Sequence, residues 1–230
     1  MAVFAIGDLH LSTVHPKPMD KFGWHNHEQK IFNNWKEQVK DGDLVLIAGD
    51  ISWEMKFKDA VLDLQKIDKM PGDKILIRGN HDYWWDSVSK MSRAFSNLSF
   101  LHNNSFVWND YCVYGTRGWN CPGSCMFKPE DSKIYNHEVL RLENSFKSRD
   151  YKNLSCKKII VMMHYPPMNE KHEDSGFTNI IDAYNTDMVV YGHLHGKDSF
   201  LSGFTGQKNN TFYNLVSCDY LNFKLLKIFD

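Results

Sequence analysis

The sequence has no excess of either charge and no long apolar run. Its 27 Lys and Arg residues are matched by 28 Asp and Glu residues, which leaves a formal net charge of −1 at pH 7. This balance argues against a nucleic-acid-binding protein, and there is no acidic tail. No apolar run approaches the roughly 20 residues of a membrane-spanning helix. We therefore expect a globular protein without a membrane partner, for which a nucleic-acid partner is disfavoured but stays an alternative.

Cysteine is scarce as well, with five residues spread widely along the chain. Cys121 and Cys125 lie close together, but no second pair completes a zinc knuckle. Nothing near Met1 resembles a signal peptide, because Asp8 follows the short first apolar stretch at once. The five cysteines are therefore expected to be free thiols in a reducing cytoplasm.

Internal repeats, low-complexity tracts and linker-like segments are also absent. The 230 residues are enough to bury a sizeable core, and an aromatic content of 14% is typical of a well-packed chain rather than a disordered one. We predict a single domain over residues 1–230. Its oligomeric state is not indicated by the sequence.

One apolar stretch organises the rest of the chain. Leu44-Val45-Leu46-Ile47 runs into Ala48-Gly49-Asp50. An apolar run of this length, ended by Gly and Asp, predicts a buried strand that delivers a carboxylate at its C-terminal end. Ligands of open α/β sheets bind at such strand ends. Because a carboxylate has two oxygens, Asp50 is able to bridge two metal ions.

The same arrangement recurs along the chain. Strands are expected over residues 2–6, 44–47, 74–77, 159–163 and 188–191. Helices are expected over residues 25–40, 58–70, 86–95, 133–151 and 180–184. The alternation of strand and helix predicts an α/β fold with a parallel sheet. A hairpin over 105–108 and 111–114 follows the first three units, and strands over 199–203, 211–215 and 225–229 are expected to form an antiparallel meander that closes a second sheet.

Each of the five strands ends in side chains that bind metals. The sets are Asp8 and His10, Asp50, Asn80 and His81, His164, and His193 and His195. Each set alone could be a pair of ordinary loop residues, but the joint pattern indicates a metal site. The donor atoms are imidazole nitrogens, carboxylates and an amide oxygen, without thiolate. Such a set suits Mn, Fe or Zn and does not choose among them.

These residues make the chain similar to the calcineurin-like metallophosphoesterases. The family's motifs stand here in the same order: Gly7-Asp8-Leu9-His10, Gly49-Asp50, Gly79-Asn80-His81-Asp82, His164 and Gly192-His193-Leu194-His195. The similarity implies a four-layer α/β/β/α sandwich of two mixed sheets flanked by helices. The protein Ser/Thr phosphatase branch has Asp-Arg-Gly after its second motif, whereas Ile51-Ser52-Trp53 follow Asp50 here. The chain therefore resembles the bacterial-type phosphohydrolases more than that branch.

The resemblance also implies two metal ions that share Asp50. It assigns Asp8, His10, Asp50 and His195 to one ion, and Asp50, Asn80, His164 and His193 to the other. Paired ions lower the pKa of a bridging water, and the resulting hydroxide would attack phosphorus in line with the leaving group. His81 is not a ligand in this scheme. The resemblance places it beside the leaving oxygen, as a general acid or hydrogen-bond donor; the alternative is a residue that only orients Asn80.

The residues that bind the substrate are less clearly marked. Arg78, Arg117 and Lys17 are candidates for a cation that binds phosphate, with an ordinary surface charge as the favoured alternative for each. Trp84 and Trp119 could stack on a base or sugar, with support of the loops as the alternative. His27, at the start of a predicted helix, could reach a site above the first strand or could belong to a solvated helix face.

Three functions are compatible with these features. The first is metal-dependent hydrolysis of a small phosphomonoester or phosphodiester, with nucleotides among the candidates. The second is a nuclease of the same fold, against which the lack of a basic excess argues. The third is a non-catalytic metal-binding scaffold, against which the complete set of ligand residues argues.

Overall fold

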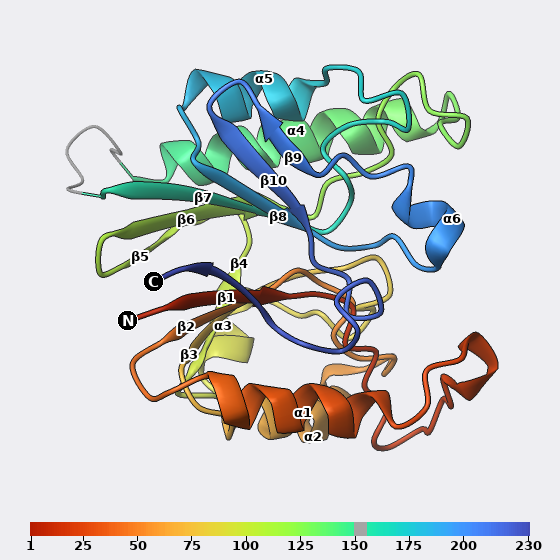
Figure 1. Ribbon diagram of the computed structural model, residues 1–230, viewed down its shortest axis with the longest axis vertical. Coiled ribbons are helices and arrows are strands. Elements are labelled where there is room, and N and C mark those ends of the chain that lie inside the picture. The colour runs from red at the N-terminus through yellow and green to blue at the C-terminus, as the bar shows by residue number, and fades with distance from the viewer. Residues whose placement is uncertain (150–155) are drawn as a thin grey trace.

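The computed structural model describes residues 1–149 and 156–230, which form two β-sheets packed face to face (Figure 1). The first sheet has the strand order β11-β1-β2-β3-β4. Its strands are β1 (Val3–Ile6), β2 (Leu44–Ile47), β3 (Asp73–Ile77), β4 (Leu98–Leu101) and β11 (Leu226–Phe229). The second sheet has the order β5-β6-β7-β8-β10-β9. Its strands are β5 (Phe106–Trp108), β6 (Tyr111–Thr116), β7 (Lys158–Met163), β8 (Met188–Tyr191), β9 (Gly206–Lys208) and β10 (Thr211–Leu215).

Helices cover the outer face of each sheet (Figure 1). The first sheet is covered by α1 (His27–Gln38), α2 (Phe57–Asp68) and the short α3 (Val88–Ser92), and the second by α4 (Asp131–Lys147) and α5 (Gly176–Ala183). Two short elements, η1 (Asp20–Phe22) and α6 (Lys197–Phe200), lie in loops at the carboxyl ends of the strands. The predicted α/β/β/α sandwich is confirmed.

The central strands of both sheets are parallel, with antiparallel strands at the edges. Strands β1 to β4 run in one direction, and β11 pairs antiparallel with β1. Strands β6, β7, β8 and β10 are likewise parallel, with β5 and β9 antiparallel at the two edges. The ends of β1 and β2 are level, since Ile6 is paired with Ile47. The segments that follow the parallel strands therefore meet at one edge of the sandwich.

Strand β2 shows why this fold needs continuous apolar runs. Leu44 and Leu46 belong to the core between the two sheets, whereas Val45 and Ile47 pack in the core under helices α1 and α2. Successive strand residues point to opposite faces, and here both faces are covered, so every residue of the strand is buried. Burying each such side chain stabilises the fold by about 1.5–3 kcal/mol.

The C-terminal part of the chain differs from the predicted meander. Strand β10 runs parallel to β8 in the second sheet, while β11 crosses to the first sheet and pairs with β1. Residues 199–203 are not a strand; they follow or form part of α6. The expectation of an antiparallel meander is therefore wrong. Apolar alternation predicts that a segment is a strand, but it does not predict which strand the segment pairs with.

Other elements differ mainly in their ends. Strand β4 was not predicted, because four residues interrupted by Ser99 give too short a pattern. Helix α5 begins earlier than residue 180, since Ser175 caps it by accepting hydrogen bonds from the backbone N–H groups of Phe177 and Thr178. Helix α4 ends at Lys147, and the part of the predicted helix over residues 150–151 lies outside the described residues.

Two cysteines are paired. Parallel pairing of β6 with β7 brings Cys112 beside Cys156, and the two form a disulfide with 5.7 Å between their Cα atoms. The expectation of free thiols is wrong for this pair and is confirmed for Cys121, Cys125 and Cys218. Because disulfides are rare in reducing compartments, the cytoplasmic location stays a prediction. No helix among the described residues is long and apolar enough to cross a membrane.

Candidate metal centre

The side chains predicted to bind metal come together at the carboxyl edge of the strands. They follow β1, β2, β3, β7 and β8, and the set is Asp8, His10, Asp50, Asn80, His164, His193 and His195. Asp8 and His164 are fully buried, and His10 and Asp50 are 3% and 2% exposed. Residues from both ends of the sequence thus form one polar cluster, in which Asn80, His193 and His195 are only partly buried.

The backbone is strained where it presents these side chains. Asp8, His10, Asp50 and His193 have positive φ angles of 60°, 46°, 49° and 74°. A non-glycine residue in this region costs about 1–3 kcal/mol and persists only where the surroundings enforce it. Here the N–H of Asp8 donates to the Gly49 carbonyl, and the N–H of His10 donates to the Asp50 carbonyl. Such strain in several neighbouring polar residues is typical of a functional site.

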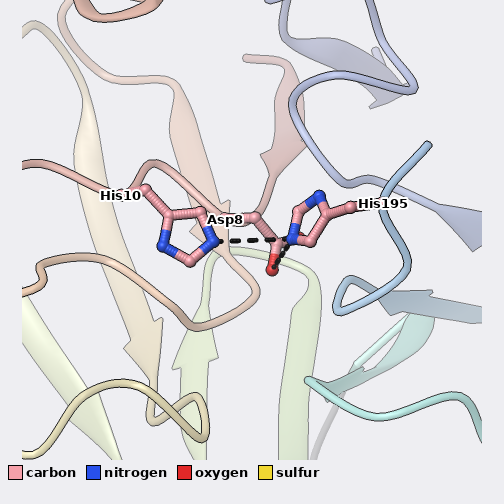
Figure 2. Close-up of side chains that lie close together, drawn as sticks. All are labelled: Asp8, His10 and His195. Carbon is pink, nitrogen blue, oxygen red and sulfur yellow. Dashed lines mark hydrogen bonds and ion pairs between the residues drawn. The ribbon is translucent and has the colours of Figure 1, made fainter. Parts of the chain in front are cut away.

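A first group of donor atoms comes from Asp8, His10 and His195 (Figure 2). The Nε2 atoms of His10 and His195 are 3.5 Å apart, and His195 Nε2 is 3.4 Å from Asp8 Oδ1. Asp50 Oδ2 approaches the same group, 3.8 Å from His10 Nε2. We call these four residues the first donor cluster.

A second donor cluster lies beside it and contains Asp50, Asn80, His164 and His193. Asn80 Oδ1 is 2.7 Å from His164 Nε2 and 2.9 Å from His193 Nδ1. Asp50 Oδ1 is 3.5 Å from His164 Nε2. Asp50 therefore places one carboxylate oxygen in each cluster.

The geometry of both clusters fits metal ions. Ligand atoms about 2.0–2.2 Å from a common ion lie roughly 3–3.5 Å from one another, which is the spacing seen among these atoms. His164 Nδ1 lies 2.9 Å from the Ala48 carbonyl oxygen. Because that carbonyl only accepts, Nδ1 carries the proton and Nε2 turns its lone pair toward the cluster, as a ligand requires. The residues present thus suit two ions with oxygen and nitrogen ligands.

The pKa shifts within the clusters also indicate that bound cations would be stabilised there. Burial and the nearby Asp8 carboxylate raise the pKa of Asp50 to about 8. Burial opposes protonation of His195, but the Asp8 carboxylate and the hydrogen bond with Asp219 raise its pKa to about 10. Burial and His164 lower the pKa of His193 to about 3, which keeps it neutral. Bound cations would stabilise both carboxylates and replace the proton on His195.

Two glycines make room for the carboxylates. A Cβ atom at Gly79 would overlap the Asp50 side chain, and one at Gly192 would overlap the carboxylate of Asp8. Glycine is therefore needed at these positions because the chain passes against the metal-binding groups, not because of its conformational freedom.

Asp219 is a supporting residue that sequence reasoning missed. One of its carboxylate oxygens accepts a hydrogen bond from His195 Nδ1 at 3.0 Å, and the other accepts from the N–H of Gly196 at 3.1 Å. This contact holds the proton of His195 on Nδ1 and directs Nε2 toward the first cluster. The signal was available, since Asp219 follows β10 as the other acids follow their strands.

Replacing Asp219 with Ala should weaken metal binding in the first cluster. Loss of a carboxylate behind a histidine ligand typically lowers metal affinity about 10–100-fold. Titration of apo protein with Mn(II) or Zn(II) in competition with a chelator measures the change. Asp198→Ala removes an exposed acid nearby in α6 and serves as the control. Equal affinities for the two variants would contradict the role assigned to Asp219.

Asp82 braces the loops that carry Asp50 and Asn80. Its carboxylate is fully buried and accepts hydrogen bonds from the N–H groups of Ile51, Ser52 and Gly79 and from the indole of Trp84. These donors occupy both oxygens, so Asp82 holds two strand ends together and does not orient the His81 ring.

Replacing Asp82 with Ala should lower the free energy of unfolding by about 3 kcal/mol or more, because several buried donors lose their acceptor. Asp86→Ala is the matched control, since its surface ion pair with Lys90 should contribute less than about 1 kcal/mol. Urea unfolding measures both. If the two variants lose similar stability, Asp82 does not brace these loops.

His81 lies beside the clusters without joining them. Its backbone N–H donates to Asp50 Oδ1 at 2.8 Å, while its half-buried ring contacts Trp53 with 4.4 Å between ring centroids. Burial, and then the neighbouring His164 and Lys17, lower the pKa of His81 to about 4. The contact with Trp53 holds the His81 ring beside the donor clusters.

His81 lines a cleft that opens next to the first donor cluster. His10 and His195 form its floor, and its apolar walls are Met19, Phe22, Trp24 and Trp53. We call it the aromatic cleft. Trp53 also stacks on His10, and the Nζ of Lys17 lies 3.2 Å from the centroid of its ring.

Four of the residues predicted to bind substrate do not line the aromatic cleft: Arg78, Arg117, His27 and Trp84. Arg117 pairs with Glu138 at 3.1 Å, and Arg78 Nε donates to the Asp82 carbonyl. His27 packs against Trp24, behind the aromatic cleft. Trp84 is only 2% exposed, which favours support of the loops, the alternative stated above, over stacking on a substrate. The roles of Arg78, Arg117 and His27 in substrate binding stay predictions.

The fold and the paired donor clusters agree with comparisons to known proteins. The family model for calcineurin-like phosphoesterases matches residues 1–197, and the chain belongs to that family. It is a metal-dependent phosphoesterase in this general sense, and the match does not name a specific reaction. No curated protein sequence matches the chain.

Solved structures share the fold at low sequence identity. Phosphopantetheinyl hydrolase from Mycobacterium tuberculosis has a TM-score of 0.62 at 14% identity, with 99% of this chain and 95% of that one covered. The protein TT1561 of Thermus thermophilus has a TM-score of 0.61 at 13% identity, with 99% and 97% covered. The protein of unknown function AQ665 from Aquifex aeolicus has a TM-score of 0.55 at 14% identity, with 98% and 95% covered.

Proposed function

We propose that this protein hydrolyses a small phosphomonoester or phosphodiester with two metal ions bound, one in each donor cluster. The observation that carries the proposal is the position of Asp50, whose Oδ2 lies 3.8 Å from His10 Nε2 and whose Oδ1 lies 3.5 Å from His164 Nε2. A carboxylate shared in this way suits a pair of ions and has no evident use in a site for one. Mn, Fe and Zn all fit these ligands.

Different residues of the chain would have different roles in such a reaction. Bound ions would supply a nucleophile at neutral pH and neutralise charge on the phosphoryl group. The strained, hydrogen-bonded backbone at Asp8 and Asp50 holds the carboxylates in position before substrate arrives. His81, at the wall of the aromatic cleft, donates a hydrogen bond from its uncharged ring to the leaving oxygen. The oxygen of water joins phosphorus as the bond to the leaving group breaks.

Two other functions are less well supported. A nuclease needs cations along its groove, and the chain has a formal net charge of −1. A non-catalytic scaffold would not need both clusters with every donor in place and an open cleft beside them.

The proposal is tested by metal analysis followed by a substrate panel. Protein reconstituted with Mn(II) should hold about two ions per chain and should cleave para-nitrophenyl phosphate, its bis-ester or a 2′,3′-cyclic nucleotide. Cleavage of single-stranded DNA, with a steep loss of activity as salt is added, would favour the nuclease. Fewer than one ion per chain and no turnover would favour the scaffold.

A further inference from the structure

A second cleft reaches the metal centre from the other half of the molecule. It touches the second donor cluster through His193. Its other lining residues are Trp119, Asn120, Cys121, Ser124, Cys125, Met126, Pro166, Met168, Asn169, Glu170, Leu194 and Ser202. We call it the loop cleft. The segment from His193 to Gly196 separates it from the aromatic cleft, which touches His195 and Gly196.

The two clefts are lined by different loops. Residues 19–24 of the aromatic cleft come from the loop after β1 in the first sheet and include η1, whereas residues 119–126 and 166–170 of the loop cleft come from the loops after β6 and β7 in the second sheet (Figure 1). The donor clusters lie where the two sheets meet. A group bound to both clusters is therefore flanked by one cleft on each side.

Hydrogen bonds between its loops shape the loop cleft. Asn169 is 4% exposed and donates from Nδ2 to the Pro122 carbonyl at 3.0 Å. The N–H of Cys125 donates to Glu170 at 2.7 Å. Met168 is buried beneath them. These contacts join the loop after β6 to the loop after β7, so hydrogen bonds within the protein fix the shape of the cleft.

From this arrangement we infer that the substrate is a phosphodiester, with its leaving group in the aromatic cleft and its retained group in the loop cleft. The inference rests on the proposed function. A phosphomonoester has a single substituent and would leave one cleft without a role. His81 lines only the aromatic cleft, which places the leaving oxygen on that side. Water and the diester give an alcohol, which takes a proton on its leaving oxygen, and a phosphomonoester that keeps the second substituent.

The lining of the loop cleft also indicates the chemistry of the retained group. Trp119, Met126 and Leu194 offer apolar contacts, and Glu170 adds a carboxylate. The loop cleft has no Lys or Arg among its described lining residues. An uncharged organic group fits such a cleft, whereas a nucleic acid strand would bring further phosphates that need cations.

A pair of substrates with the same leaving group tests the inference. Para-nitrophenyl phosphate and bis(para-nitrophenyl) phosphate both release para-nitrophenol, and only the second has a retained organic group. With the Mn(II)-loaded protein, kcat/KM should be about tenfold or more higher for the diester, because its second ring gains contacts in the loop cleft. Cleavage of the monoester with equal or higher kcat/KM would overturn the inference and leave the proposed function standing. No cleavage of either by metal-loaded protein would reject both.

Chemical modification of Cys125 gives an independent test. Cys125 is an exposed free thiol that lines the loop cleft, whereas Cys121 and Cys218 are buried. Burial also raises the pKa of the Cys121 thiol to about 12, which protects it from alkylation. N-benzylmaleimide should therefore attach a ring in the loop cleft and leave the aromatic cleft open.

The modified protein should lose about tenfold or more in kcat/KM for the diester and less than about twofold for the monoester. Mass spectrometry confirms single labelling, and Cys125→Ser protein given the same reagent should behave like Cys125→Ser protein without it. Equal losses for the two substrates, or no loss for the diester, would show that the loop cleft does not hold the retained group.

Discussion

Asp50→Asn protein is expected to lose at least about 10³-fold in kcat/KM, a change of roughly 4 kcal/mol in transition-state stabilisation. The amide keeps the shape of the side chain but removes its negative charge and one of the two acceptor oxygens. Because Asp50 reaches both donor clusters, the variant should also bind less metal at both. Metal content by mass spectrometry and turnover of the best substrate in the panel measure the two effects.

The control for this variant is Asp41→Asn, which changes an exposed acid in the turn before β2. It should bind metal and turn over substrate like the unaltered protein. If Asp50→Asn kept near-normal rates, or lost only one ion, Asp50 would not be the shared ligand.

His81→Ala protein is expected to keep its metal and to lose about 10²–10⁴-fold in kcat, the usual contribution of a proton donor. The loss should depend on the leaving group. An alkyl alcohol leaves poorly without a proton, whereas para-nitrophenolate needs little help, so the defect should be larger for an alkyl ester. A residue that only supports Asn80 would not produce this dependence.

His137→Ala, an exposed histidine on α4, is the matched control and should leave both metal content and rate unchanged. Metal loss in His81→Ala would instead make His81 a ligand or a support for one. A defect of the same size for alkyl and para-nitrophenyl esters would contradict its role beside the leaving oxygen.

Much of the site was predictable from local sequence. Leu44–Ile47 is a strand over the residues expected, and Asp50 follows it as a buried carboxylate. The motif residues Asp8, His10, Asn80, His164, His193 and His195 meet where the resemblance implied. Parallel strands bring their carboxyl ends to one edge of a sheet. Polar residues that each follow such a strand can therefore be predicted to lie close together.

The weaker predictions concern residues whose role depends on their neighbours. Asp82 ends the Gly79–Asp82 motif and Trp84 comes shortly after it, yet Trp84 is buried and Asp82 joins two loops. Asp219 lies far from His195 in any pattern read along the chain, although the two are in contact. Side-chain direction in loops is set by packing and hydrogen bonds, which local propensity does not encode.

By itself, the sequence determined the five strands that end in donor residues, their order along the chain and the donor atoms they deliver, since apolar period and residue chemistry are local properties. Only the tertiary structure decided that β11 joins the first sheet, that Cys112 meets Cys156, and that two clefts flank the donor clusters. Those features depend on contacts between segments that are far apart in the sequence, and such contacts are not encoded in any local pattern.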